Sequence, residues 1–397
     1  MLPKERIAAA FEHEPTDAAL RSPDSEFRSG RSTSKVPVYQ AGFSSRVASA
    51  LLGREAYVGG GIQQYREAKA LWDGPQAHQE FLECARRDAF DLPRVLDLDL
   101  VRPSYWRLNE KPTRRLDDCT FFYGDESSSW RVMRFDPPTE LYQVVARSPS
   151  PPPTLADVVA EVDGFEAALV SYQPQPEQFG DELAALAEFG QERAVEAFGI
   201  GLCVPREEIW LEAIALRPDL VRRYLSAQAE YAARNAAALS ALGFQYLMGG
   251  GDFACKHGPF YSPKAFHDLM LPALQRVSQA CHDHGCYHCF ASDGDLWPVA
   301  DDLFGRSGVD CFYEIDRRAG MDLARLRSRF PHLTLMGGIS SETLHLGSRE
   351  QVVAETRSAL QAAQEHGSII VGCSNQIVAP TPIANVEAML ETIRELR

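Results

Sequence analysis

Residues 244–290 read FQYLMGGGDFACKHGPFYSPKAFHDLMLPALQRVSQACHDHGCYHCF, and this stretch decides the fold. Its two ends are short runs of β-forming residues, which predict strands over 244–248 and 286–290. Between them Ser262 is a suitable N-cap with Pro263 at the first helical position, and Gly285 supplies the left-handed residue that ends the helix. A strand, a helix and a second strand in this order predict a parallel crossover unit.

The same alternation continues from this unit to the C-terminus. Ser348 and Gln351 form a capping box, which predicts a helix that ends before Gly367. Further helices are expected over 296–303, over 321–329 and from 383 onward, and further strands over 311–315, 333–336 and 369–371. Upstream, strands are expected over 36–39, 98–101 and 198–202. The number of strands approaches eight, so we expect an α/β protein built as a (β/α)8 TIM barrel. A doubly wound open sheet is the second choice, because no G-x-G-x-x-G follows any of these strands.

The length and the breaks in composition fit one large domain. The chain has 397 residues, which allows either several ordinary domains or one barrel with additions. We expect a single domain over 1–397, with an N-terminal helix and exposed loop over 1–35 and a Pro-rich connector, RSPSPPPT, over 147–154.

Composition and charge exclude several classes of protein. Hydrophobic residues make up 45% and charged residues 24%, which is typical of globular proteins and not of disordered or collagen-like chains. The net charge of −15 argues against nucleic acid as a partner. No stretch approaches 18 consecutive apolar residues, so no membrane span is expected. The nine cysteines, an odd number without a secretory signal, favour reduced thiols and a cytoplasmic location.

Polar residues that follow the expected strands are the candidate site, because barrel enzymes place their active sites at the C-terminal ends of the strands. Asp252 and Asp293 are the expected catalytic acids or bases. The expected substrate-binding residues are Tyr39, Arg46, Arg102, Tyr105, His257, Asp295, Glu314 and Asn375. Simpler structural roles compete with these predictions. Each Asp could form a turn or cap a helix, Arg46 could pair with a surface acid, and Asn375 could stabilise a loop.

The segment CHDHGCYHC, residues 281–289, is rich in residues that bind soft metals. Its first half lies on the expected helix end and its second half on the expected strand, where Cys289 faces away from Cys286 and His288. Neither half contains a C-x-x-C pair. We therefore expect a buried structural segment, with zinc binding here as the less favoured alternative.

Several motifs resemble those of one enzyme family. They are KERIAAAFEHEPTD at 4–17, VPVY at 36–39, GDFACKHGPFYSPKAFHDLMLP at 251–272, GVDCFYEIDRRAGMDLARLR at 308–327, MGGIS at 336–340 and TPIANV at 381–386. Together they resemble the uroporphyrinogen decarboxylase superfamily, which also contains cobamide-dependent methyltransferases. The resemblance implies a (β/α)8 barrel that is commonly a homodimer.

The resemblance also shows where this chain departs from both branches of the family. The decarboxylases carry two arginines after the first strand; here Arg46 matches the second, but Gly42 stands at the first. The methyltransferases hold zinc through a His, a Cys and a second Cys, and those positions here are Ala291, Asp293 and Asn375. These departures argue against tetrapyrrole decarboxylation and against zinc-thiolate chemistry.

Three functions remain as hypotheses. The first is a cofactor-independent decarboxylase or other lyase that acts on a small anionic, carboxylated substrate through the acids at the strand ends. The second is a methyltransferase that uses a corrinoid protein or a folate as methyl carrier, with a divalent metal at the acids or no metal at all. The third is a barrel that binds a ligand without catalysis.

Overall fold

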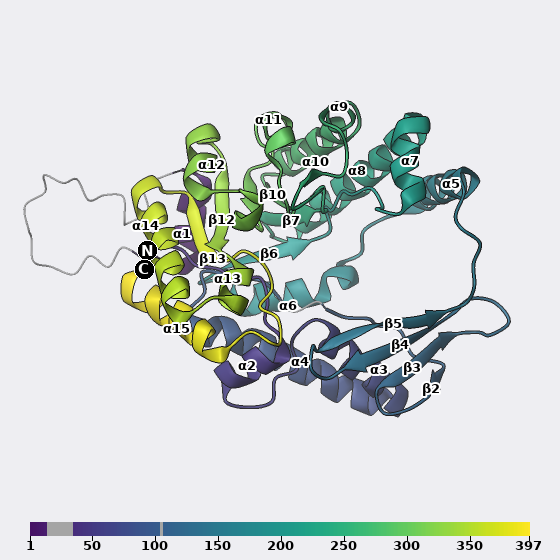
Figure 1. The fold of residues 1–397 in the computed structure, drawn as a ribbon, viewed down its shortest axis with the longest axis horizontal. Coiled ribbons are helices and arrows are strands. Elements are labelled where there is room, and N and C mark those ends of the chain that lie inside the picture. Colours follow the sequence, from purple (N-terminus) through teal and green to yellow (C-terminus); the bar gives the residue numbers. More distant parts are fainter. Residues whose placement is uncertain (14–34, 104–105) are drawn as a thin grey trace, which may run out of the picture.

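A curled parallel sheet forms the centre of the computed structural model, which describes residues 1–13, 35–103 and 106–397 (Figure 1). The sheet has seven strands, each parallel to its neighbours. In spatial order they are β1 (Leu100–Val101), β6 (Ala194–Phe198), β7 (Tyr246–Gly250), β10 (Tyr287–Ala291), β11 (Cys311–Tyr313), β12 (Thr334–Ile339) and β13 (Ile369–Cys373). Because the strands are parallel, their C-terminal ends meet at one rim.

Helices connect the strands and cover the outside of the sheet. They are α6 (Gly180–Phe189), α8 (Pro218–Ala241), α10 (Leu271–Asp283), α11 (Ala300–Leu303), α12 (Leu323–Arg329), α14 (Arg349–His366) and α15 (Ile383–Leu396). The crossover predicted over 244–290 is confirmed as β7, α10 and β10, with Ser262 Oγ accepting a hydrogen bond from the Ala265 amide at 3.1 Å. Gly285 ends this helix with a φ of 70°, as expected. A short helix α9 (Pro263–Ala265) and a π-helical turn (Phe266–Met270) precede α10, where Pro272 cannot donate to a regular helical hydrogen bond.

The strand predicted over 198–202 lies four residues earlier, at Ala194–Phe198. Glu196, at the middle of this strand, breaks its apolar pattern, so the sequence FGIGL that follows looked more strand-like. The Glu196 side chain is nevertheless completely buried. The strand was therefore placed too late in the sequence, because an ionisable residue interrupts its apolar pattern.

The segment 36–39 also differs from its prediction as a strand. It forms a single bridge, between Val38 and Val371. Its backbone is nevertheless bonded on both sides, because Val371 donates to Pro37 O at 2.9 Å and Asp99 donates to Val38 O at 3.0 Å. In the described part of the chain, the expected eight-stranded barrel is thus a curled sheet of seven strands with this segment between β13 and β1.

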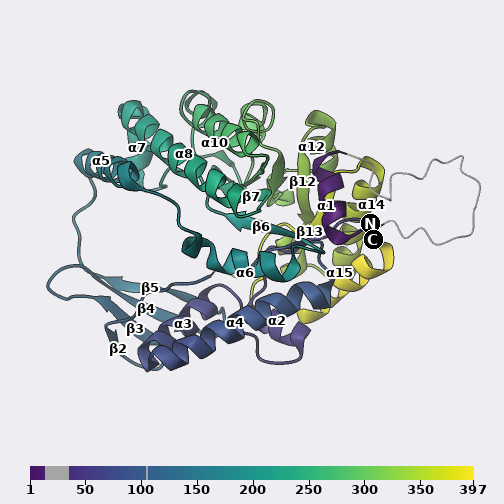
Figure 2. The same cartoon turned by 180° about the vertical axis from the view of Figure 1, so that it is seen from behind.

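Helix α1 (Pro3–Phe11) closes the N-terminal end of the sheet. The Phe11 ring lies 4.9 Å from the Tyr246 ring and 4.7 Å from the Tyr287 ring, at the first residues of β7 and β10. The two chain ends lie side by side here (Figure 2), and Arg6 and Arg397 both pair with the buried Asp99 carboxylate. The interior of the sheet is therefore covered at this end, which leaves the C-terminal rim as the site of polar residues.

A second sheet, which was not predicted, lies beside the parallel one. Its four antiparallel strands are β2 (Arg114–Arg115), β3 (Thr120–Gly124), β4 (Trp130–Asp136) and β5 (Leu141–Arg147).

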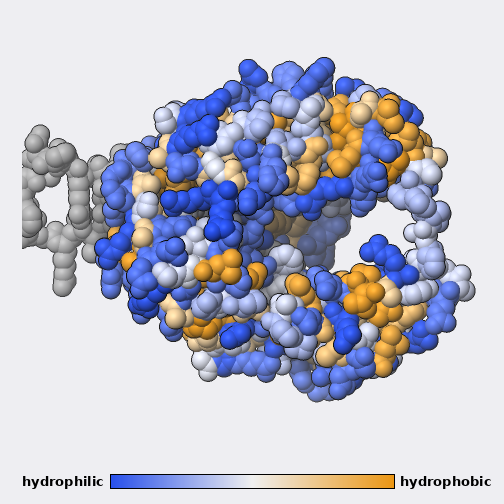
Figure 3. Space-filling model, viewed as in Figure 1, coloured by the Kyte–Doolittle hydropathy of each residue, from blue (hydrophilic) through white to orange (hydrophobic). Residues whose placement is uncertain are grey.

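The remaining α-helices and strands are α2 (Ser45–Leu52), α3 (Gly61–Asp73), α4 (Pro75–Leu96), α5 (Leu155–Ser171), α7 (Glu208–Leu216), α13 (Ser341–Leu346), β8 (Ala254–Cys255) and β9 (Gly258–Pro259). The predicted connector lies between β5 and α5, and Figure 3 shows a deep cleft between this sheet and the helices above it. Among the described residues, no helix has both the length and the apolar character needed to cross a bilayer.

Candidate active site

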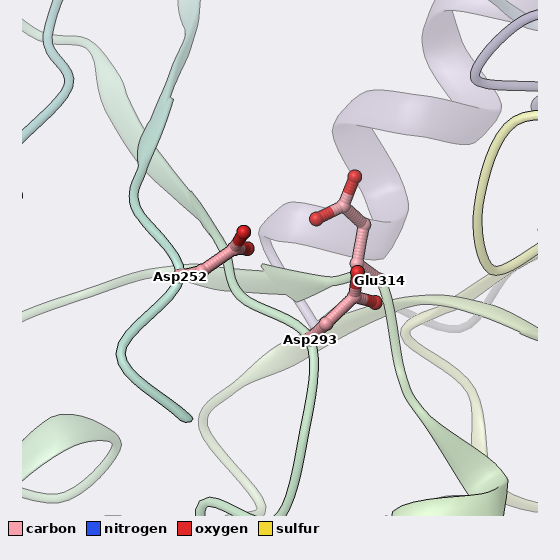
Figure 4. A group of neighbouring side chains, drawn as sticks. All are labelled: Asp252, Asp293 and Glu314. Atoms are coloured by element: carbon pink, nitrogen blue, oxygen red, sulfur yellow. The ribbon is translucent and has the colours of Figure 1, made fainter. Parts of the chain in front are cut away.

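Three carboxylates converge at the C-terminal rim of the parallel sheet (Figure 4). Asp252 lies two residues beyond β7, Asp293 two residues beyond β10, and Glu314 directly after β11. One oxygen from each side chain lies within 4.8 Å of an oxygen of the other two. The two acids expected to be catalytic and one expected to bind substrate thus form a single group.

The backbone brings these acids together through two unusual conformations. Gly250 has a φ of 133°, and a Cβ at this position would lie 2.3 Å from the Ala291 carbonyl oxygen. Only glycine therefore lets the end of β7 approach the end of β10 so closely. Glu314 has a φ of 65°, which is uncommon for a residue with a side chain and is found most often at functional sites.

Burial and mutual repulsion change the protonation of this group. Burial, with the Asp293 and Asp252 charges, raises the pKa of Glu314 to about 8. Burial and the Asp252 charge raise the pKa of Asp293 to about 6, while the Asn375 amide donates to both Asp293 oxygens, at 3.0 and 3.3 Å, and opposes the shift. A proton donor and a base with separated pKa values therefore lie side by side at neutral pH.

The three carboxylates have two possible uses in chemistry. Converging oxygen ligands suit hard cations such as Mg²⁺ or Mn²⁺. Without a cation, the same group can donate a proton to a substrate and accept one from it. Asn375 fixes the orientation of one of the three carboxylates in either case.

A buried ionic group lies below the rim. Arg102 follows β1, and its Nε lies 3.5 Å from Oε1 of Glu196 on β6. The Arg102 Nη1 donates to the Tyr39 hydroxyl at 3.4 Å, and its guanidinium lies over the Phe198 ring at 4.7 Å. Arg102 and Tyr39 were both expected to bind substrate, and the structure brings them together. Arg102 also lowers the pKa of Glu314 through its charge, which links the buried group to the acids.

A pocket opens beside Arg102. Its lining consists mainly of apolar side chains from 41–43, 58–59, α4 and the residues around Arg102. Two polar side chains, Arg102 and the buried Gln40, face it. The rim therefore combines an acidic group with an apolar pocket that contains one cationic side chain.

Four predicted substrate-binding residues lie apart from this arrangement or outside the described residues. Arg46 is exposed on α2, and its backbone amide donates to the Glu140 carboxylate at 3.0 Å. His257 is exposed in the turn between β8 and β9. Asp295 accepts a hydrogen bond from the Trp297 amide at 3.0 Å, which is the turn-forming role that competed with its prediction. Tyr105 lies outside the described residues.

Two residues of the site were missed from the sequence. Arg206 Nη1 lies 3.2 Å from the Asp252 carboxylate, although Arg206 was not among the candidates that follow the strand predicted over 198–202. Glu196 was missed because its strand was placed four residues too late. Correct placement of β6 would have put Glu196 inside the sheet and the 199–207 segment at the rim.

The Cys/His segment has the expected structural role. Cys281, Cys286 and Cys289 are buried free thiols, and His288 Nδ1 is hydrogen bonded to Ser278 Oγ at 2.8 Å. In the described part of the chain, the acids at the rim are the one group of three or more such side chains placed to share an ion.

The zinc site implied by the methyltransferase branch does not fit these residues. Ala291 has no ligand atom, and the Asn375 amide donates to Asp293 and so is oriented toward a carboxylate. Cys373, the nearest thiol in the sequence, is buried within β13. One carboxylate and one amide cannot replace a His and two thiolates as ligands of zinc.

Comparisons with known proteins agree with this fold. Residues 206–396 match the family model for uroporphyrinogen decarboxylase (URO-D). No curated protein matches the chain. The structure of a methyltransferase from Methanosarcina mazei is similar over 100% of this chain and 99% of its own, with a TM-score of 0.59 and 17% identity. A D-tagatose 3-epimerase-like protein matches 56% of this chain and 85% of its own at a TM-score of 0.33 and 10% identity.

The first of these structures shares the fold along the whole chain, and the family model covers the part that contains all three acids. The TM-score of the second structure is too low to support an argument. From the family match we conclude that residues 206–396 are a divergent member of the uroporphyrinogen decarboxylase superfamily, and the whole chain shares its fold with the methyltransferase.

Proposed function

We propose that the chain is a lyase that decarboxylates a small carboxylated substrate by acid–base catalysis at Asp252, Asp293 and Glu314. The observation that carries this proposal is the convergence of three carboxylates at the open rim, two of which have a raised pKa. Neighbouring acids whose environments separate their pKa values are typical of acid–base sites.

The chemistry assigns a role to each acid. The bond between the substrate and its carboxylate breaks, CO₂ leaves, and the electron pair passes to an electron-accepting group of the substrate, such as a carbonyl or a protonated ring. Glu314 then donates its proton to the carbon atom and regains one from water. Asp293, held by Asn375, and Asp252 orient the substrate and accept protons from its polar groups.

Methyl transfer is the second candidate, because the structure that matches the whole chain is that of a methyltransferase. In this reaction a corrinoid protein or a folate would carry the methyl group, and the three acids would bind a hard cation or the substrate itself. Cys203 is a thiol that interacts with Asp252, but burial raises its pKa and so disfavours the thiolate needed to activate a methyl acceptor; decarboxylation remains the first proposal.

We further infer that the segment 36–39 fills the position of an eighth strand and closes the barrel. Its backbone hydrogen bonds to Val371 on one side and to Asp99 on the other support this reading. A closed barrel would hold Tyr39 and Arg102 beside each other, as their hydrogen bond requires.

A substrate screen tests the function. We would incubate the protein with β-keto acids and with aromatic and heteroaromatic carboxylic acids, and measure CO₂ release. For an accepted substrate, Glu314→Gln and Asp293→Asn should each lower kcat at least about 100-fold, the usual contribution of a general acid or base. Asp283→Asn, an exposed acid at the far end of α10, is the matched control.

Three other outcomes would contradict the proposal. Full activity of both site variants would show that the acids have no catalytic role. Consumption of methylcobalamin or methyltetrahydrofolate, without CO₂ release, would favour methyl transfer. Binding of carboxylates without any turnover would favour a ligand-binding barrel.

A further inference from the structure

The pocket beside Arg102 has the composition of a binding site for an apolar molecule with one charged end. Its walls include Ala41, Phe43, Val58, Leu92, Leu98 and Trp106. Arg102 is its one charged lining residue in the described part of the chain, and its side chain is 12% exposed. Apolar walls with a single fixed charge favour a ligand of the same pattern and opposite sign.

Glu196 contacts Arg102 but does not line the pocket. Its side chain is completely buried, and neither carboxylate oxygen has a hydrogen-bond partner among the described residues. Arg102, at 3.5 Å, is the cation that compensates its charge. A buried carboxylate without hydrogen bonds is costly to ionise, so its charge depends on this one neighbour.

The surroundings of Glu196 make its protonation sensitive to Arg102. Burial raises the pKa of Glu196 to about 8, and the Arg102 charge opposes that shift. Other titratable groups that interact electrostatically with it come from several packed elements: Tyr39, Glu182, Cys289 and Tyr313. Burial also raises the pKa of Tyr39, Cys289 and Tyr313, so these three groups remain neutral near pH 7. Glu182, whose pKa burial also raises, can only add negative charge, which leaves Arg102 as the compensating charge.

We infer that this pocket binds a small carboxylate with an apolar body, and that Glu196 takes up a proton when the carboxylate pairs with Arg102. This inference rests on the proposed function, because the pocket would hold the substrate that reacts at the acids. Where Glu196 is ionised, the incoming anion replaces it as the counter-ion of Arg102, and protonation removes the charge that would otherwise remain buried. The proton comes from solvent.

The inference predicts the direction of a pH effect on binding. Below about pH 8 Glu196 is protonated, so its charge does not compete with an anion for Arg102. Above that pH the ionised Glu196 competes with the ligand for Arg102. By linkage, a pKa of about 8 predicts that the Kd of the anion increases about tenfold between pH 7 and pH 9.

The test uses benzoate as the probe and isothermal titration calorimetry as the measurement. For the wild-type protein, we expect the Kd of benzoate to rise about tenfold from pH 7 to pH 9. Glu196→Gln cannot ionise, so its Kd should stay constant over this range. Asp283→Asn, which changes an exposed acid at the C-terminal end of α10, is the control and should retain the wild-type increase.

Two further measurements keep the test decisive if Glu196→Gln does not fold. Titrations of the wild-type protein at pH 9 in buffers of different ionisation enthalpy should show the uptake of nearly one proton per benzoate. Ala89→Phe, which fills the apolar wall, should weaken benzoate about tenfold or more and leave acetate unchanged.

Several results would overturn the inference. They are the absence of benzoate binding at pH 7, a tenfold increase that persists in Glu196→Gln, and binding without proton uptake at pH 9. The persisting increase would assign the pH effect to Glu314, whose pKa is also about 8. None of these measurements requires turnover, so failure of the proposed reaction and failure of this inference are distinguishable.

Discussion

Asp99→Asn should strongly destabilise the fold, because Asp99 joins both ends of the chain to the sheet. Its Oδ1 accepts hydrogen bonds from Arg6 Nε and Nη2 at 2.9 and 2.5 Å. Its Oδ2 accepts from the Val38 amide at 2.7 Å and from Arg397 Nη2 at 2.6 Å. Asp99 is completely buried, so an amide in its place leaves two arginines without a buried counter-charge. The expected loss is about 3–5 kcal/mol of unfolding free energy.

Urea denaturation followed by circular dichroism measures this loss. Asp97→Asn is the matched control, since the Asp97 side chain is 50% exposed while it pairs with Lys35 and Arg397. Its loss should stay below about 1 kcal/mol, as for other exposed ion pairs. If Asp99→Asn cost no more than Asp97→Asn, the assignment of Asp99 as the junction of α1, β1, the 36–39 segment and the C-terminus would be wrong.

Three further predictions follow from other parts of the structure. The rate of an accepted substrate should peak near pH 7, because protonation of Asp293 below about 6 removes the base and ionisation of Glu314 above about 8 removes the acid; a rate that is flat from pH 5 to 9 would contradict these roles. Phe11→Ala should cost about 3–5 kcal/mol in urea unfolding, because its ring packs on two tyrosines inside the sheet, and a loss below about 1 kcal/mol would show that α1 does not close it. Gly250→Ala should destabilise the protein more than Gly285→Ala, because a Cβ at 250 meets the Ala291 carbonyl oxygen at 2.3 Å whereas one at 285 meets no atom within 4 Å; equal losses in thermal unfolding would refute this packing.

The alternation of strands and helices from 244 to the C-terminus was predictable, because local signals determine each element there. Ser262 and Ser348 cap their helices as expected, and Gly285 ends its helix in the left-handed conformation. The errors upstream have physical causes. Glu196 interrupts the apolar pattern of β6. It can be buried there because Arg102, which is distant in the sequence, lies beside it in the folded protein and compensates its charge. The antiparallel sheet over 114–147 lacks the alternation with helices on which the prediction relied.

The candidate site was partly predictable for a related reason. Parallel strands bring their C-terminal ends to one rim, so Asp252, Asp293 and Glu314 could be expected to meet. The contact of Arg206 with Asp252 depends on the path of a loop, which strand order does not determine. Residue type alone favoured His257 as a binding residue, but the β8–β9 turn places it on the surface.

The most direct test of the acid–base site is the protonation state of Glu314 in the resting protein. Carbon-13 NMR of protein labelled at the glutamate carboxyl carbons, recorded from about pH 4 to 10 for the wild type and Glu314→Gln, identifies its resonance by its loss in the variant. The structure predicts that this resonance titrates near pH 8, so that Glu314 carries a proton at neutral pH. Titration near the ordinary glutamate value of 4.5 would contradict the proposed role of Glu314 as the proton donor.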